Sequence, residues 1–495
     1  MRLLSSVNRR RPQSQWIANA LEYVLRRLKS LSQLYSICTE PAPLIEHGLR
    51  CRSMLISGHA LAKDTSIHSL EHDAGDWNAT RLLVVALCFM LNMLDGTDLL
   101  IMSFIAPVLS ENWRVSPERL GVLFSASLGG MAVGCLLIAP LADRLGRRAA
   151  IIGALTLVAA AMILSGLSRN LTELTIARLF VGVGVGTIGV SMTAMAAEFA
   201  PDRHADFAVA FVQAGWPLGS IITAFVAVGA LPLYGWRSML VGIGLLSAAL
   251  LIVIWALFPE SLDFLTWRRP TGTLERLNAI RRRLDLPLVA QLPSPPAAKV
   301  RGLPIAALFA DGRARASVLL WSAVTLSYFV LYFVISWVPK LVAQAGLPLS
   351  EAIYAGATYN LGAFIGTAAV GWIAVRFRLD RVVASFLGLA AVAMLIFGGL
   401  GMPVWLTLLV ALCVGVTVQG GFNGYWAVAA RLYPVTMRST GIGWALGVGR
   451  IGAVLGPIVG GLLVGARVPM STIFSIYTLP LLAAACMTLG IKLKR

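Results

Sequence analysis

The sequence has 495 residues, of which 58% are hydrophobic and only 13% are charged. About 25% of residues are charged in an average soluble domain, so this composition excludes an ordinary soluble protein and predicts a chain that spans a membrane. The formal net charge of +18 indicates arginine-rich loops held on the cytoplasmic side of that membrane, and we expect no nucleic-acid partner.

Residues 1–80 precede the first apolar segment and are predicted to form a partly disordered cytoplasmic extension. The stretches NRRRPQ and YVLRRLKS make residues 1–53 too polar for a signal peptide or a further span. Translation from Met54 would still leave a segment before the first helix. We therefore expect the native protein to lack residues 1–53.

Twelve apolar segments follow, each close to the roughly 20 residues that cross a bilayer. Six lie within residues 81–258 and six within 317–495, which predicts an all-α membrane protein of two pseudo-symmetric six-helix bundles. The predicted spans are 82–108, 119–140, 149–167, 171–197, 206–230, 237–258, 317–343, 350–375, 382–402, 404–430, 440–465 and 470–491. The polar residues 259–316 are predicted to form a central cytoplasmic loop with a short helix in ERLNAIRRRL. Lysine and arginine are concentrated in alternate loops, which predicts that both termini are cytoplasmic.

The two halves repeat each other. APLADRLGRR from Ala139 corresponds to GWIAVRFRLDR from Gly371, and AAEFAP in the first half corresponds to AARLYP in the second. A parallel repeat of six helices predicts a substrate cavity between the halves near the middle of the membrane.

These residues resemble the major facilitator superfamily, whose loop signature is similar to PLADRLGRR. The signature's leading glycine is replaced by Ala139, and the second copy has Val375 where the first has Asp143. DGTD and FIAP in the first helix, with RSTGIGWALGVGRIGAVLGP from Arg438, are similar to the aromatic acid:proton symporters. The resemblance implies a multi-pass carrier of a bacterial inner membrane that imports benzoate-type or hydroxybenzoate-type acids, and we expect it to function as a monomer.

Two acids lie inside the first span. Asp95 and Asp98 are three residues apart and therefore project from nearly the same face of a helix. An acid inside a membrane is costly unless it is paired, hydrated or protonated, so the pair is predicted to take up and release the coupling proton. The alternative is a static hydrogen bond to Asn92 or to a facing helix that fixes packing.

Two arginines also lie within predicted spans. A guanidinium group offers a planar fork that binds a carboxylate through two hydrogen bonds. We predict that Arg450 binds the substrate carboxylate and that Arg178 interacts with the acids of the first helix. The alternative for each arginine is a static ion pair. The family resemblance implicates both positions in transport.

Rings and amides are expected to complete the substrate pocket, although some of them will only pack or join helices. These candidates are Tyr328, Tyr332, Gln213, Trp216, Asn360, Gln419 and Asn423.

A separate set of residues is predicted to gate the carrier by forming salt bridges when one conformation closes. These are Asp143, Arg144, Gly146, Arg147 and Arg148 in the DRLGRR loop, together with Glu198, Arg431 and Arg438. The alternative for any single arginine is ordinary positive-inside topology.

Other classes of protein fit less well. An ATP-driven pump needs a phosphate loop with Gly-Lys, and this sequence contains no such pair. Its six cysteines show no C-x-x-C spacing, so we expect no metal site. An enzyme would need a nucleophile or metal cluster, but only His68 and His72 are close together, so we expect no enzyme activity. The proton is the expected coupling ion, and we expect no other cofactor. The nearest alternatives are a proton-coupled carrier of a non-aromatic acid, such as a dicarboxylate or sugar acid, and a receptor that binds without transport.

Overall fold

The computed structural model describes residues 76–292, 305–310, 312–399, 403–433 and 437–491. Side chains within these ranges are described except at positions 140, 143, 202, 206 and 438–440. The predictions made for residues 1–53, and for nearly all of the extension 1–80, lie outside the described residues.

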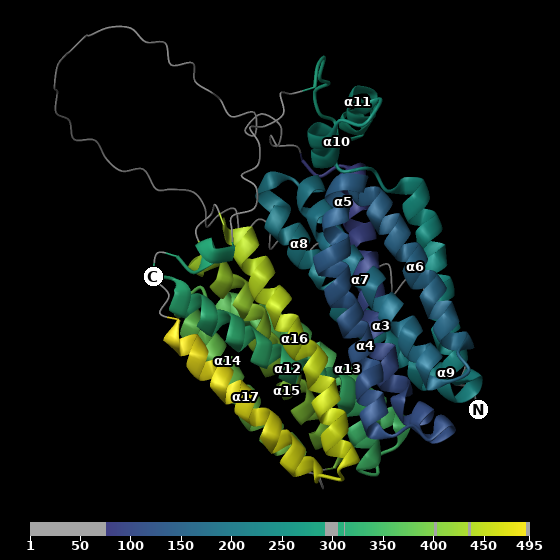
Figure 1. Cartoon of the computed structure of the whole chain (residues 1–495), viewed down its shortest axis with the longest axis vertical. Coiled ribbons are helices and arrows are strands. Elements are labelled where there is room, and N and C mark those ends of the chain that lie inside the picture. Colours follow the sequence, from purple (N-terminus) through teal and green to yellow (C-terminus); the bar gives the residue numbers. More distant parts are fainter. Residues whose placement is uncertain (1–75, 293–304, 311, 400–402, 434–436, 492–495) are drawn as a thin grey trace, which may run out of the picture. The chain divides into compact units, whose positions relative to one another are not determined.

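The N-terminal half comprises the helices between Ala79 and Leu257 (Figure 1). They are α3 (Ala79–Trp113), α4 (Pro117–Val133), the π-helical turn η1 (Gly134–Ile138), α5 (Ala139–Leu145), α6 (Arg147–Leu167), α7 (Leu171–Phe199), η2 (Asp202–His204), α8 (Ala205–Gln213) and α9 (Gly215–Leu257). Asn78 and Asn170 cap α3 and α7, because each side chain accepts a hydrogen bond from a first-turn amide.

The central loop follows, with α10 (Leu262–Arg268), α11 (Thr273–Arg283) and η3 (Ile305–Leu308). The helix predicted in ERLNAIRRRL is confirmed as α11. The C-terminal half then comprises α12 (Ala314–Gln344), α13 (Leu349–Ile373), α14 (Leu379–Gly398), α15 (Val404–Leu432), α16 (Arg438–Gly465) and α17 (Met470–Gly490).

Ten described helical segments are long and apolar enough to cross a membrane. One of these, Phe207–Leu257, contains two spans, because Gly235 adopts φ 74° and breaks the helical path of α9. The more polar α13 is not among the ten, although its 25 residues are long enough to cross a bilayer. With it the described residues account for the twelve predicted spans, and the predicted all-α membrane fold is confirmed.

Glycines allow helices of one half to pack with their backbones in contact. A Cβ atom on Gly96 in α3 would lie 2.0 Å from the carbonyl oxygen of Trp216 in α9. In the other half, a Cβ atom on Gly452 in α16 would lie 1.9 Å from the carbonyl oxygen of Thr325 in α12. In lipid there is no hydrophobic driving force between helices, so close van der Waals packing of this kind stabilises their association. It also fixes the rotation of α3 and α16, and therefore the direction of their charged side chains.

The two halves contact each other mainly near the loop that holds Arg114, and we call this side of the protein the Arg114 end. There α4 and α16 lie side by side (Figure 1). Ser125 Oγ donates to the carbonyl oxygen of Val454 at 2.7 Å, and Phe124 packs edge-on against Trp337 at 5.5 Å between ring centroids. The Lys340 ammonium donates to the Ser110 hydroxyl.

The opposite side of the protein, where the Gly146 turn lies, is the Gly146 end. Near this end the side chains of Leu136 in η1 and Trp444 in α16 are 50% and 39% exposed. Among the described residues, the hydrogen bonds that join the two halves are those of Ser125 and Lys340 and two made by Arg450. The polar contacts between the halves therefore run from the Arg114 end only as far as Arg450.

Candidate functional site

The two acids of α3 lie in the N-terminal half. Asp98 is only 2% exposed, and neither of its carboxyl oxygens has a hydrogen-bond partner among the described residues. The same holds for Oδ1 of Asp95. A narrow cavity adjoins both carboxyl groups and is otherwise apolar; its lining is Leu91, Leu94, Asp95, Asp98, Leu155, Val158, Val185, Ile188, Gly189 and Met192. The face of α3 that was predicted to carry both acids thus forms part of the wall of one cavity.

Arg178 is completely buried in α7 beside these acids. Its guanidinium donates to the backbone oxygen of Asp98 at 2.6 Å, to Ser127 Oγ at 3.2 Å and to Met162 Sδ at 2.9 Å. Arg178 and Asp98 are therefore neighbours, as predicted, but the hydrogen bond is made to the peptide group. No described carboxylate oxygen lies within 4.0 Å of the Arg178 guanidinium.

Arg450 reaches from α16 toward the N-terminal half. Its two terminal nitrogens lie 3.8 Å from Met131 Sδ and 4.0 Å from Cys135 Sγ. Within the described part of the chain, no carboxylate forms an ion pair with it. Asp95, on the facing half, lies close enough to interact with its charge. Arg450 is thus a cation between the halves whose hydrogen-bond partners are two weak acceptors.

Two predicted aromatic residues lie beside Arg450. Tyr328 and Tyr332 in α12 are stacked with 5.6 Å between ring centroids, and both lie within electrostatic range of the guanidinium. Gly449 leaves room for the Tyr328 ring, since a Cβ atom on this glycine would lie 2.8 Å from that ring. Phe422 in α15 packs on Tyr328 at 4.4 Å; this residue was not predicted, because one phenylalanine in an apolar span carries no distinguishing signal.

The predicted amides mostly bond within their own half. Asn92 Nδ2 donates to the side-chain oxygen of Gln213 at 3.0 Å, and Asn423 Nδ2 donates to Thr367 Oγ1 at 2.7 Å. These two pairs join neighbouring helices, which is the alternative role expected for a lone amide. Asn92 Nδ2 also donates to the peptide oxygen of Val212 at 2.7 Å, so both of these hydrogen bonds are made to α8.

Three further candidates have less complete contacts. Asn360 is buried, with its Oδ1 unpartnered among the described residues, and the same is true of Gln419 Oε1. Trp216 is half-buried, and its backbone packs against Gly96 one residue from Asp95. These three stay candidates for the substrate pocket.

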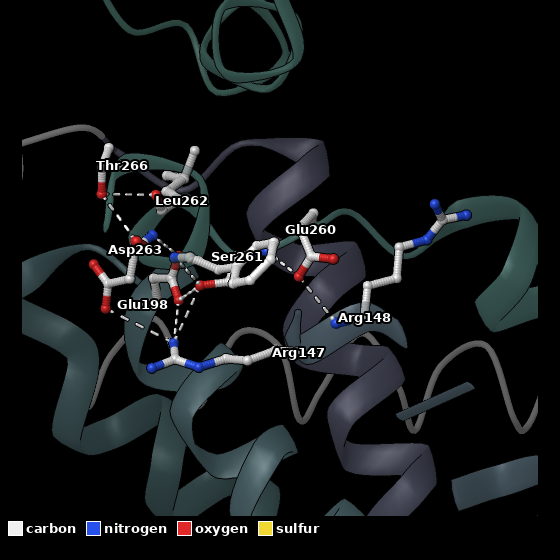
Figure 2. Close-up of polar contacts among 9 residues, drawn as sticks. Arg147, Arg148, Glu198, Glu260, Ser261, Leu262, Asp263 and Thr266 are labelled. Atoms are coloured by element: carbon white, nitrogen blue, oxygen red, sulfur yellow. Dashed lines mark hydrogen bonds and ion pairs between the residues drawn. The ribbon is translucent and has the colours of Figure 1, made fainter. Parts of the chain in front are cut away.

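Three of the predicted gating residues, Arg147, Arg148 and Glu198, belong to a polar cluster at the Gly146 end (Figure 2). Arg147 pairs with Glu198, whose side chain is only 3% exposed. Glu198 also accepts hydrogen bonds from Ser261 Oγ at 2.8 Å and from the backbone amide of Asp263 at 3.0 Å. Glu198 therefore caps the first turn of α10 and ties the central loop to the N-terminal half.

A second carboxylate completes this attachment. Glu260 Oε1 accepts a hydrogen bond from the backbone amide of Arg148 at 3.0 Å, in the first turn of α6 (Figure 2). Gly146 adopts φ 103°, and a Cβ atom there would lie 2.6 Å from Glu260 Oε2. The positive φ thus favours glycine at this turn of the DRLGRR loop, and the absence of a side chain leaves room for the Glu260 carboxylate. Ser261 and Glu260 were not predicted, because only the fold brings the FPES segment to α6.

The other gating candidates are less informative. Arg144 and Arg431 are exposed, and the side chains of Asp143 and Arg438 lie outside the described residues. The polar contacts described above lie within the N-terminal half or join it to the central loop. That this set gates the carrier therefore stays a prediction.

The Glu198 cluster gives a first testable expectation. Glu198→Ala should lower the free energy of unfolding by about 3 kcal/mol, because it leaves Arg147 and the Asp263 amide without their buried partner. Thermal unfolding of the purified protein in detergent measures this change. Glu275→Ala, at an exposed acid of α11, is the control, and equal stability of the two variants would contradict the expectation.

Comparison with known proteins agrees with this architecture. The sequence profile of the Major Facilitator Superfamily matches residues 85–457 and, in a second match, residues 320–493. The chain is 33% identical over 417 residues to the 4-hydroxybenzoate transporter PcaK of Pseudomonas aeruginosa, covering 83% of this chain and 92% of that relative. It is 30% identical over 422 residues to the gallate transporter of Pseudomonas putida, covering 83% of this chain and 93% of that relative.

A solved structure shares the fold. The partially occluded inward open conformation of the xylose transporter XylE from E. coli matches with a TM-score of 0.64 at 16% sequence identity. The match covers 83% of this chain and 98% of XylE.

Proposed function

The chain belongs to the Major Facilitator Superfamily, a family of multi-pass membrane transporters, and we propose that it imports small aromatic carboxylates together with protons. The observation that carries this proposal is Arg450, a guanidinium between the halves with no described acidic partner and with two stacked tyrosines beside it. Its relatives that are named for gallate and 4-hydroxybenzoate transport support an aromatic substrate.

The substrate class follows from the chemistry of this site. A carboxylate between the halves would accept two parallel hydrogen bonds from the Arg450 fork. The rings of Tyr328 and Tyr332 offer a surface on which an aromatic ring stacks. Buried amide oxygens such as Asn360 Oδ1 are available to a ring hydroxyl. Import of benzoate-type or hydroxybenzoate-type acids uses all three features.

Asp95 and Asp98 are the proposed proton carriers. Both adjoin an apolar cavity, and an ionised carboxylate there lacks the hydration it would have in water. Proton uptake removes that cost. Because Asp95 also lies within range of Arg450, a substrate carboxylate bound to Arg450 would change the electrostatic environment of Asp95. This link couples substrate binding to proton binding.

The transport cycle is proposed to be alternating access. With both termini cytoplasmic, the Gly146 end faces the cytoplasm of a bacterial inner membrane, so the contacts at the Arg114 end close the protein to the outside. A proton and the substrate would enter when these contacts open and leave when they close again. The proton is the only coupling ion that this cycle needs, no cofactor takes part, and one monomer suffices.

The test compares the parent protein with Asp98→Asn in proteoliposomes. The parent should accumulate labelled 4-hydroxybenzoate when an inward proton gradient is imposed. Asp98→Asn should lose this accumulation but keep exchange of substrate across the membrane, because it removes the titratable group and leaves Arg450 in place. Asp285→Asn, at an exposed acid of the central loop, should behave like the parent.

Three results would contradict the proposal. Unchanged accumulation in Asp98→Asn would remove Asp98 from coupling. No uptake of 4-hydroxybenzoate or benzoate by folded parent protein would shift the assignment to a carrier of a dicarboxylate or sugar acid. Binding of either acid without any flux would instead indicate a receptor.

A further inference from the structure

Among the described residues, the Arg450 guanidinium donates its side-chain hydrogen bonds to two sulfur atoms of the opposite half. Met131 lies near the end of α4 and Cys135 lies in η1, whereas Arg450 belongs to α16. The Met131 and Cys135 sulfur atoms lie 3.8 and 4.0 Å from the two terminal nitrogens of the guanidinium. Thioether and thiol sulfur are weak hydrogen-bond acceptors, and a carboxylate oxygen is a strong one.

The backbone of Met131 and the thiol of Cys135 both contact α7. A Cβ atom on Gly186 would lie 2.3 Å from the carbonyl oxygen of Met131, so the two backbones touch. Cys135 Sγ donates to the carbonyl oxygen of Gly186 at 3.2 Å. The π-helical geometry of η1 adds a residue to this turn, and such bulges are frequent at functional sites.

We propose that Met131 and Cys135 are positioning residues, which hold the Arg450 guanidinium between the halves before substrate binds and yield it to the substrate carboxylate. The inference rests on the proposed function. A strong acceptor at either position would pair with Arg450 and compete with the substrate. With no acceptor there, the guanidinium is free to turn toward Asp95, which lies within electrostatic range. A sulfur atom is an acceptor of intermediate strength, which holds the guanidinium in place but yields it to a carboxylate.

The first experiment strengthens the acceptor. Cys135→Asp should raise KM for 4-hydroxybenzoate uptake about tenfold or more, because a carboxylate beside Arg450 forms the ion pair that the substrate must break. Met131→Gln places a neutral amide oxygen at the other position with little change in volume, and it should raise KM in the same direction. In both variants kcat should change less than KM, whereas a variant with damaged packing loses kcat.

The second experiment removes the acceptors. The double variant Met131→Leu with Cys135→Ala should raise KM about fivefold. Replacing the alanine by serine, so that residue 135 regains a polar acceptor, should lower KM again. Cys88→Ala removes a buried thiol from α3 of the same half and is the matched control.

Equilibrium binding of 4-hydroxybenzoate to the purified, monodisperse variants separates the possible outcomes. Weaker binding by Cys135→Asp and Met131→Gln than by the parent supports the inference. Equal binding by the parent and both variants overturns it, and the proposed function would still stand. A parent that neither binds nor transports aromatic acids overturns the proposed function and this inference together.

Discussion

Arg450→Ala is expected to lower kcat/KM for 4-hydroxybenzoate uptake by about 100-fold or more. Losing one member of a buried, hydrogen-bonded charge pair costs about 3 kcal/mol, which corresponds to about two orders of magnitude. The loss should be this large because the described residues provide no second cation at the same place; Arg178 bonds to Asp98, Ser127 and Met162 instead. Uptake into proteoliposomes across a range of substrate concentrations measures the effect.

Arg450→Lys separates charge from geometry. Lysine keeps the positive charge but lacks the planar fork, so its activity should lie between that of the parent and that of Arg450→Ala. Arg315→Ala, at an exposed position early in α12, serves as the control and should transport normally. If Arg450→Ala transports as well as Arg315→Ala, Arg450 does not bind the substrate, and the proposed site is wrong.

Gly461→Ala is expected to open the contact between the halves at the Arg114 end. A Cβ atom on Gly461 in α16 would lie 2.6 Å from the carbonyl oxygen of Pro117 and 3.2 Å from Cα of Gly121 in α4. Backbone atoms of both helices meet here, so the added methyl group is accommodated only when α4 and α16 separate. Overpacking of this kind costs about 1–3 kcal/mol, enough to shift a two-state equilibrium about tenfold.

Labelling of Ser125→Cys with a membrane-impermeant maleimide measures this opening, because Ser125 is buried at the same contact. Its labelling should rise about tenfold when Gly461→Ala is added. Gly443→Ala is the control, because a Cβ atom on this glycine of the same helix would have no described atom within 4 Å, and labelling should not rise there. Equal labelling in both backgrounds would show that the Gly461 contact does not hold the halves together.

The thermal unfolding temperature distinguishes opening from misfolding. Within each half, the packing of α3 on α9 and of α12 on α16 does not involve the face of Gly461 that touches α4. Gly461→Ala should therefore unfold close to the parent's temperature while its uptake rate falls, because the cycle needs the Arg114 end to close. A large drop in stability would instead mean that the substitution damages a half.

The membrane fold could be predicted from the sequence almost completely. Each span is a local run of apolar residues, and the ionisable residues within the spans, such as Asp98, Arg178 and Arg450, stand out because charge inside a membrane is rare. Repetition of the DRLGRR loop likewise revealed two halves without any knowledge of their packing. These features depend on residue type and order alone.

The partners of those charged residues were decided by the tertiary structure. Arg178 bonds to the peptide oxygen of Asp98, Arg450 to the sulfur atoms of Met131 and Cys135, and Glu198 to the first turn of α10. A membrane helix is apolar on nearly every side, so its sequence does not reveal which face turns toward another helix. Helix rotation is set instead by backbone contacts such as Gly96 against Trp216, and these bring together residues that lie far apart in the chain.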